Sequence, residues 1–460
     1  MRAPGPPGDP YLGHWRHLRS DTIGLLLRGM TSYGDVVRFE RRGVPIHLLA
    51  HPEHVKHVLQ DNVKNYLRRS PGYTKIRTVV GSGLVAADGE LWKKQRRIVQ
   101  GAFTRDRVLS FADSMRRSTR EMLEAWKTAA ERGEPIDVSA EMMRLTLRIV
   151  TETIIGTAKG TRVDAISDAL SYVLRDASER VDTIELPERV PTPRNRRFRR
   201  ALESLHDVID RTIAERRASG DTRDDLVGRL MAARDEETGE GMSDAQLRDE
   251  IMTMFFVGHD STAHALTWTF YCLSLHPDAR RDVFREIDTV LGGREPETAE
   301  LSKLQATERA FKESMRLYPP VWILVRAVAT DDVVGGYDLP GRSIVVVSPI
   351  ATHHNPRLWA DPEGFDPDRF LPENEAKRSR YAYFPFGGGP RTCLGYSFAM
   401  MEADIILAMV SQRYALDLVP GQRITPFQGF TLSPSDPMWM RLVPRLVPGA
   451  SQPALSPPLS

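Results

Sequence analysis

The chain has 460 residues, 41% of them hydrophobic and 27% charged, and its 63 basic residues nearly balance its 61 acidic ones. This profile predicts a folded globular protein with a large core, and it excludes general disorder and nucleic-acid binding through net charge. Because no apolar run near the N-terminus is long enough for a signal peptide or a membrane span, we expect a cytoplasmic protein that binds neither membrane nor nucleic acid.

Pro, Gly and Ser dominate both ends of the chain, in residues 1–12 and 446–460. These ends carry too few apolar residues to offset the entropy of ordering them, so we predict two flexible tails. No repeat or Gly/Ser linker divides the interval between them. We therefore expect one large domain over residues 13–445.

Two apolar runs separated by Gly43 predict a short hairpin over Val36–Ala50. From about residue 106 to residue 290, apolar residues recur at helical spacing, with breaks at Gly and Pro. A second β-like stretch lies near Ala327–Val347, and the final 30 residues also look extended. The sequence therefore predicts a mainly α fold with a small β region.

One predicted helix is unusually long. It begins at a capping box, Ser243–Gln246, and keeps helical spacing without a break until His276. Its apolar middle ends where Asp260, Ser261 and Thr262 follow one another. A buried carboxylate beside a hydroxyl can carry protons. A solvent-facing acid and a Ser bonded back to its own helix explain these residues equally well.

The most informative segment is Phe386–Gly395, a Gly-rich loop that places Cys393 just before a helical pattern. The dipole of that helix favours a thiolate, and the glycines let backbone N–H groups approach the sulfur, which suits a metal ligand. Taken alone, such a segment is more commonly a turn with a buried, inert thiol. Cys272, late in the long helix, is predicted to be a small core residue.

This loop resembles the cysteine loop of the cytochrome P450 family of haem-thiolate monooxygenases, in its soluble bacterial type. The matching positions are Phe386, Gly389, Arg391, Cys393 and Gly395. Further matches occur in the order usual for the family, at Gly258–Thr262, Glu313–Arg316 and Phe365–Phe370. The resemblance extends over nearly the whole chain, so it implies the cytochrome P450 fold as one large domain.

The resemblance implies one haem b (iron protoporphyrin IX) whose metal ligand is the thiolate of Cys393, a ligand that favours cleavage of the O–O bond. Basic and aromatic side chains would meet the haem propionates. The implied cofactor-binding residues are Trp92, Arg96, Arg326, Phe386, Arg391, Cys393 and Gly395.

By the same resemblance, Glu313, Arg316 and Arg369 form a buried charge network with a structural role, where the residues alone would suggest a surface ion pair.

Asp260, Ser261 and Thr262 would be the catalytic residues that deliver protons. Ser261 occupies a position that is usually Thr in this family, and Val257 one that is usually a smaller residue. Since Val257 and Ser261 share a helix face, Val257 should narrow the space above the iron.

The implied activity uses dioxygen (O2) to hydroxylate or epoxidise an apolar small molecule of terpenoid, polyketide or fatty acid type. The alternatives are a haem-thiolate isomerase or dehydratase, which needs no external electrons, and a non-catalytic haem-based sensor, which needs no proton relay. The implied substrate pocket comprises Val257, Val321, Trp322, Ile323, Leu324, Phe430 and Thr431.

No flavin or iron–sulfur segment follows the cysteine loop. We therefore expect a monomer that receives electrons from NAD(P)H indirectly, through a separate ferredoxin or flavodoxin and its reductase. Basic residues on the cysteine side would attract such an acidic donor, although a solvated basic face is the alternative. The cluster comprises Lys93, Lys94, Arg97, Arg105, Arg107, Arg378 and Arg380.

Overall fold

The computed structural model describes residues 1–156, 190–220 and 225–445, together with residues 169, 170, 172, 173, 175–177, 179, 180 and 223. The C-terminal segment 446–460, which was predicted to be a flexible tail, lies outside the described residues. Within the described ranges, no helix is both long and apolar enough to cross a membrane.

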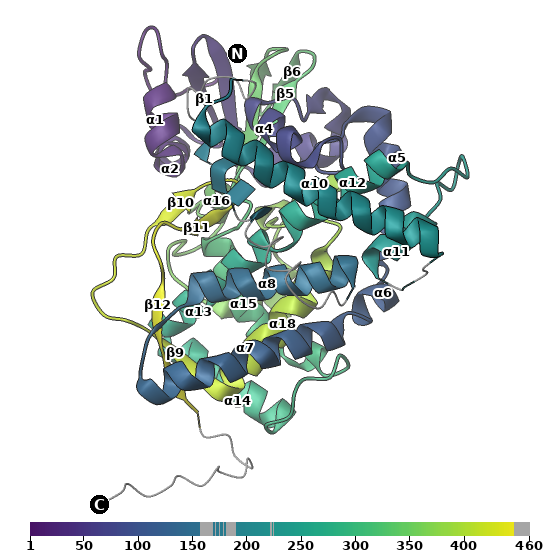
Figure 1. Cartoon of the computed structure of the whole chain (residues 1–460). Coiled ribbons are helices and arrows are strands. Elements are labelled where there is room, and N and C mark those ends of the chain that lie inside the picture. Colours follow the sequence, from purple (N-terminus) through teal and green to yellow (C-terminus); the bar gives the residue numbers. More distant parts are fainter. Residues whose placement is uncertain are drawn as a thin grey trace, which may run out of the picture.

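Helices make up most of the molecule, so the predicted mainly α fold is confirmed (Figure 1). The helices are α1 (Trp15–Ser20), α2 (Thr22–Tyr33), α3 (Pro52–Lys56), α4 (Pro71–Val80), α5 (Gly89–Gln100), α6 (Arg105–Leu109), α7 (Ala112–Arg132), α8 (Val138–Ile155), α10 (Pro193–Ser219), α11 (Leu226–Ala232), α12 (Asp244–Gly258), α13 (Asp260–Leu275), α14 (Pro277–Leu291), α15 (Gln305–Leu317), α16 (Pro349–His353), α17 (Pro372–Glu375) and α18 (Tyr396–Arg413).

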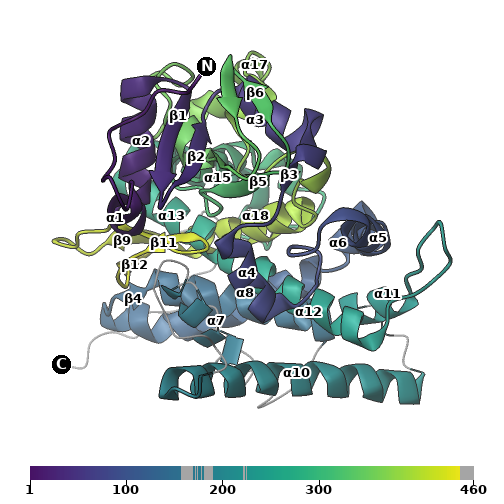
Figure 2. The same ribbon diagram turned by 90° about the horizontal axis from the view of Figure 1, so that it is seen from above.

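The main sheet has five strands and joins the two β regions that the sequence predicts. Its order is β1 (Val36–Arg41), β2 (Val44–Leu49), β8 (Ile344–Val347), β5 (Leu324–Val328) and β3 (Tyr66–Leu67). The predicted hairpin is the antiparallel pair β1–β2, and β2 pairs with β8 in parallel. Figure 2 shows this sheet and the long helix α10 on opposite sides of the molecule.

The other strands form three small antiparallel sheets. They are β4 (Ile136–Asp137), β12 (Trp439–Pro444) and β9 (Tyr414–Leu418) in one sheet, β10 (Pro426–Gln428) and β11 (Leu432–Pro434) in a second, and β6 (Asp332–Val334) and β7 (Tyr337–Leu339) in a third.

The largest apolar core lies among the helices, where α13 packs against α8, α15 and α18, and α18 packs against α7. Helix α18 is buried on nearly all sides from Met400 to Gln412, which explains why its sequence shows no polar face. Because α18 directly follows the cysteine loop, this packing holds the loop at the centre of the protein.

The N-terminal segment differs from the prediction of a flexible tail. Ala3 is buried in an apolar cluster with Val36 and Leu49, and the backbone N–H of Arg38 donates to the Pro4 carbonyl at 2.7 Å. The chain around Ala3 and Pro4 therefore packs along the sheet edge, because β1 offers backbone groups to which a Pro-rich segment can bond without being a strand itself.

The single long helix predicted from Ser243 to His276 is not continuous. It is interrupted at His259, between α12 and α13. The His259 ring bonds to the Phe255 carbonyl at 2.8 Å, and the Ser261 hydroxyl donates to the Val257 carbonyl at 3.0 Å. In an unbroken helix these carbonyls would accept the backbone N–H groups of His259 and Ser261. These side-chain bonds lie at the break, next to Gly258.

Candidate active site

A cavity of about 1830 Å³ opens beside the cysteine loop, and its wall is built from α5, α12, α13, β5 and the turn before α18. Every residue predicted to bind the cofactor, deliver protons or line the substrate pocket lies in this wall. They are Trp92, Arg96, Val257, Asp260, Ser261, Thr262, Val321, Trp322, Ile323, Leu324, Arg326, Phe386, Arg391, Cys393, Gly395, Phe430 and Thr431.

The cysteine loop presents the thiol of Cys393 to this cavity. The Cys393 N–H donates to the Phe386 carbonyl at 3.0 Å, which closes the loop. Gly389 has a φ of +65°, and a Cβ there would lie 1.9 Å from the Leu59 carbonyl oxygen, so no other residue fits. Burial raises the pKa of the Cys393 thiol, while the Gly395 N–H and the Arg96 guanidinium favour the thiolate.

The other thiol has a different environment. Cys272 is 2% exposed within the core of α13, and burial raises its pKa far above the usual range. A thiol held neutral in apolar surroundings is a poor metal ligand. The structure therefore places Cys393, and not Cys272, where a cofactor can reach it.

Four guanidinium groups line the cavity near the cysteine loop. Arg391 pairs with Asp88 at 2.5 Å and lies over the Trp92 ring at 4.2 Å. Arg326 donates to the Tyr73 hydroxyl at 3.1 Å, and Arg96 donates to the Thr392 carbonyl at 3.2 Å. The fourth, Arg68, donates to the Val85 carbonyl at 2.7 Å.

This cluster has more positive charge than its neighbours neutralise. Among the described residues, Arg391–Asp88 is the ion pair that these four side chains make. Burial and the charge of Arg68 lower the pKa of Arg391 to about 9. An apolar cavity with a thiol on one wall and excess guanidinium charge on another fits a haem, whose thiolate ligand and two anionic propionates need these groups.

Arg68 and Tyr73 also belong to this cluster, although they are not among the cofactor-binding residues that the sequence predicts. The local signal is weak, because an Arg between a short strand and a helix is usually solvated. Their position in the cluster depends on the pairing of β3 with β5, which brings Arg68 toward Arg326 and cannot be predicted from the local sequence.

Asp260 begins α13 and is held from two directions. The Nε2 atom of His264 lies 3.3 Å from its carboxylate, and the Thr431 hydroxyl donates to its other oxygen. Burial alone would raise the pKa of Asp260, but His264, with smaller contributions from His259 and Thr431, lowers it to about 2. The carboxylate is therefore ionised and fixed in the cavity wall.

The two hydroxyl residues that follow Asp260 have different neighbours. Ser261 bonds back to the Val257 carbonyl and borders the cavity. Thr262 is 4% exposed and faces Glu402 on α18, a fully buried acid. Burial raises the pKa of Glu402 well above its usual range, so a neutral acid lies behind Thr262.

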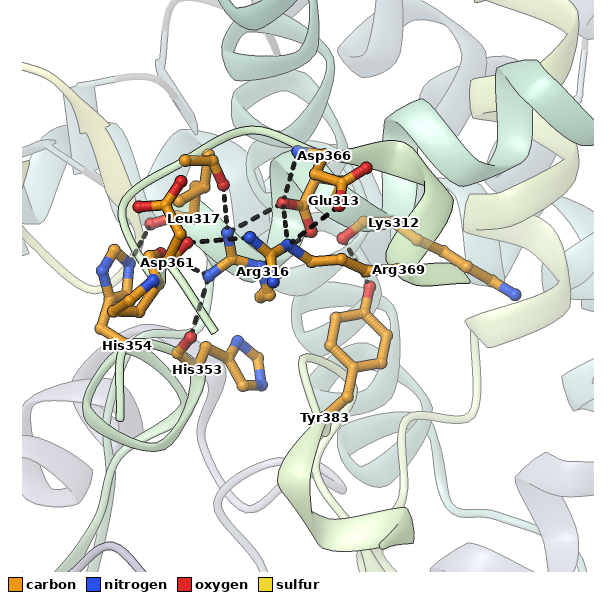
Figure 3. A network of polar contacts seen from close by, with 12 residues as sticks. Lys312, Glu313, Arg316, Leu317, His353, His354, Asp361, Asp366, Arg369 and Tyr383 are labelled. Carbon is orange, nitrogen blue, oxygen red and sulfur yellow. Dashed lines mark hydrogen bonds and ion pairs between the residues drawn. The ribbon is translucent and has the colours of Figure 1, made fainter. Parts of the chain in front are cut away.

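Figure 3 shows the predicted charge network of Glu313, Arg316 and Arg369, in which Glu313 and Arg316 are fully buried and Arg369 is 12% exposed. Arg316 donates to both Glu313 oxygens at 2.8 Å and to the backbone carbonyls of His353, Pro362 and Gly364. Arg369 lies 3.3 Å from Glu313. These contacts tie α15 to the segment before the cysteine loop.

Three of the seven basic residues on the cysteine side form ion pairs with acids among the described residues. Lys94 pairs with Glu240 at 2.6 Å, and Arg97 pairs with Asp235 at 3.1 Å and Glu237 at 3.0 Å. Lys93 pairs with Glu90, and Arg378 stacks on the Trp359 ring at 4.2 Å. Acids of the loop before α12 therefore cover part of the expected basic cluster, at Lys94 and Arg97.

Comparison with known proteins agrees with this geometry. The family model described as Cytochrome P450 matches residues 3–440. Cyclooctatin synthase of Streptomyces melanosporofaciens is 37% identical, over 96% of this chain and 95% of its own. Cyclooctat-9-en-7-ol 5-monooxygenase of the same organism is 33% identical, over 90% of each chain.

Pentalenene oxygenase of Streptomyces avermitilis is 32% identical, over 92% of this chain and 93% of its own. Among solved structures, the crystal structure of the cytochrome P450DA heme domain matches with a TM-score of 0.89 at 26% identity. That match covers 97% of this chain and 98% of the other.

Proposed function

The chain belongs to the cytochrome P450 family and is a monooxygenase, and we propose on that basis that it hydroxylates or epoxidises an apolar terpenoid. The observation that carries the proposal is the single cavity wall that joins the Cys393 thiol, the acid Asp260 and a set of bulky apolar side chains. By their names, two relatives act on an unsaturated hydrocarbon and an unsaturated alcohol.

Haem, when bound, supplies the iron at which dioxygen is activated and from which one oxygen atom reaches the substrate. Cys393 would hold the metal, and the N–H of Gly395 and the charge of Arg96 would stabilise its thiolate against the opposing effect of burial. Arg391, Arg326 and Arg68 would hold the propionates, and the Trp92 ring packs against the Arg391 guanidinium.

The residues at the break between α12 and α13 deliver protons in this proposal. Asp260 stays ionised at neutral pH because His264 and Thr431 stabilise its charge, so it can accept a proton from solvent and pass it on. Ser261, the next residue, borders the cavity with a hydroxyl that both donates and accepts. Thr262, backed by the neutral acid Glu402, gives this segment a second hydroxyl.

The apolar wall excludes water and orients the substrate. Phe256 packs edge-on against Phe430, with ring centroids 5.5 Å apart, and Val257 stands exposed to the cavity on the same helix. Terpenoids are recognised by this kind of shape-fitting apolar surface. Electrons come from NAD(P)H through a separate ferredoxin or flavodoxin and its reductase.

Reconstitution tests the proposal. The haem-loaded protein is screened with terpenes for the Soret shift that marks displacement of water from ferric iron, and shifting compounds are incubated with NADPH, a ferredoxin and its reductase. We expect oxygenated products, and isotope from labelled dioxygen in them. Product formed without the reductase would identify an isomerase or dehydratase, and binding without any product would identify a sensor.

A pair of variants tests which of the two thiols binds the iron. Cys393→Ser should abolish the red-shifted Soret band of the ferrous carbon monoxide complex, whereas Cys272→Ser should keep it because that thiol lies in the core. Loss of the band in Cys272→Ser alone would contradict the assignment of Cys393.

A further inference from the structure

One acid in the cavity wall has no part in the chemistry described above. Glu250 lies on α12 and is fully buried, yet it borders the cavity together with Leu84 and Thr253. Its Oε2 accepts the Leu84 N–H at 3.1 Å. Its Oε1 has no hydrogen-bond partner among the described residues. An unpaired buried oxygen is costly, so its retention in a ligand cavity needs an explanation.

Glu250 lies on the face of α12 that borders the cavity. Glu250, Met254, Val257 and Ser261 follow at intervals of three or four residues, and all of them border the cavity. Glu250 therefore belongs to the helix face that carries the relay residue Ser261. About seven residues, or roughly 10 Å of helix, separate it from Val257.

The charge state of Glu250 follows from its neighbours. Burial raises its pKa to about 8, the Leu84 N–H opposes that rise, and the nearby Asp249 adds to it. No cation pairs with Glu250 among the described residues, whereas Asp249 accepts the Ser82 N–H at 2.8 Å. At neutral pH the side chain is then largely a neutral acid, with Oε2 bonded to the loop and an O–H on the free side.

A second polar atom without a partner lies in the same wall. Thr153 Oγ1 on α8 is buried and has no hydrogen-bond partner among the described residues. The Thr146 hydroxyl donates to the His259 carbonyl, and Val150 faces Gly258. Helices α8 and α12 therefore run antiparallel, which places Thr153 about one turn further toward the Glu250 end of the cavity.

We propose that Glu250 is a substrate-recognition residue, which donates a hydrogen bond to a hydroxyl or carbonyl oxygen already present on an otherwise apolar terpenoid. The inference rests on the proposed function and narrows its substrate class to oxygenated terpenoids. A preceding oxygenation or hydration reaction must supply such a substrate. Because Glu250 lies roughly 10 Å along the helix from Val257, the new oxygen enters the skeleton far from the existing one.

Matched ligands test this inference on the haem-loaded protein. Cedrol is an alcohol and the hydrate of the hydrocarbon cedrene, and further hydrocarbon and alcohol pairs with other terpene skeletons complete the panel. Their Kd values are measured from the Soret shift and by calorimetry. We expect the alcohol of a bound pair to bind about fivefold to tenfold more tightly than its hydrocarbon, the effect of one hydrogen bond.

Three variants distinguish a role of Glu250 in ligand recognition from a purely structural role. Glu250→Gln keeps an acceptor for the Leu84 N–H and a donor for the ligand, so the preference for the alcohol should persist. Glu250→Leu should remove the preference and leave the Kd of the hydrocarbon within about twofold. Thr253→Val removes a neighbouring hydroxyl that already donates to the Asp249 carbonyl, and it should leave the preference unchanged.

An infrared measurement serves even if Glu250→Leu does not fold. The infrared band of the protonated Glu250 carboxyl is the one that is missing in Glu250→Gln. In the wild-type protein this band should shift when the alcohol binds and stay in place when the hydrocarbon binds. Equal Kd values within every pair, or a preference that survives in Glu250→Leu, would overturn the inference while leaving the proposed function intact. Absence of binding by every hydrocarbon and alcohol would overturn the proposed function and this inference with it.

Discussion

His264 lies one helical turn after Asp260, and its Nε2 atom is 3.3 Å from the Asp260 carboxylate. Both residues border the cavity, and the Thr431 hydroxyl bonds to the second oxygen of the same carboxylate. The charge of the acid at the helix break is thus stabilised mainly by a neighbour on its own helix.

Removing the ring should change the pH dependence of turnover. In His264→Leu, the effect of burial on Asp260 is no longer opposed by the His264 ring, so the pKa of Asp260 rises from about 2. An acid limb should then appear in the kcat profile at a pH higher by roughly one unit or more than in the wild type. Thr431→Val, which removes one hydrogen bond, should shift the limb less. Identical profiles for His264→Leu and the wild type would show that the pair does not control Asp260.

Ser261 is expected to control how efficiently electrons produce oxygenated product. Ser261→Ala should bind haem and substrate normally, but the yield of product per NAD(P)H should fall severalfold and hydrogen peroxide should rise. Ser274→Ala is the matched control, because Ser274 also bonds back to its own helix, at the Tyr271 carbonyl. If coupling is unchanged in Ser261→Ala, Thr262 becomes the hydroxyl to test.

The pairing of Lys94 and Arg97 predicts how electron transfer responds to charge. Replacing their exposed partners, in Glu237→Gln with Glu240→Gln, uncovers positive charge on the cysteine side. The apparent KM for an acidic ferredoxin should fall severalfold at low salt. The difference should vanish near 1 M salt, where the screening length is about 3 Å. An unchanged KM at low salt would place the docking face elsewhere.

The buried pair Arg316–Glu313 should dominate the stability of its region. Arg316→Ala leaves Glu313 without its bidentate partner, so the free energy of unfolding should fall by about 3–5 kcal/mol in urea titrations. Arg281 and Asp278 have the same spacing on the surface of α14, and Arg281→Ala should cost less than about 1 kcal/mol. Equal effects in the two variants would contradict a structural role for the buried network.

The sequence predicts the thiol and its loop well, because Phe386–Gly395 is a local pattern with fixed requirements. The buried pair of Glu313 and Arg316 is likewise three residues apart and can be found from the motif. Contacts between distant segments that belong to no motif could not be predicted. The Thr431 hydroxyl reaches Asp260 from 171 residues away, and Glu240 reaches Lys94 from 146.

The break at His259 was missed for a different reason. Helical spacing counts apolar side chains, and it does not report the bonds that the side chains of His259 and Ser261 make to the carbonyls of Phe255 and Val257 at the break. The packing of Ala3 was missed because Pro-rich composition reports low helix and strand propensity, and it does not exclude an extended segment that bonds to an edge strand.

Glu250 should make stability depend on pH. The ordinary pKa of a Glu side chain in water, which applies to the unfolded chain, is 4.5, and burial raises it to about 8 in the folded protein. Between these two values the folded state therefore holds a proton that the unfolded state has lost. As the pH rises from 4.5 to about 8, the free energy of unfolding therefore decreases by about 1.4 kcal/mol per pH unit. It is greatest below pH 4.5, and the decrease is complete above about pH 8.

The variant Glu250→Gln has no proton to lose, so its stability relative to the wild type should grow by about 4 kcal/mol from pH 5 to pH 8. Urea unfolding at each pH measures this difference. Glu90→Gln, at an exposed acid paired with Lys93, should show no such growth. A difference between Glu250→Gln and the wild type that stays constant with pH would mean that Glu250 is ionised in the folded protein.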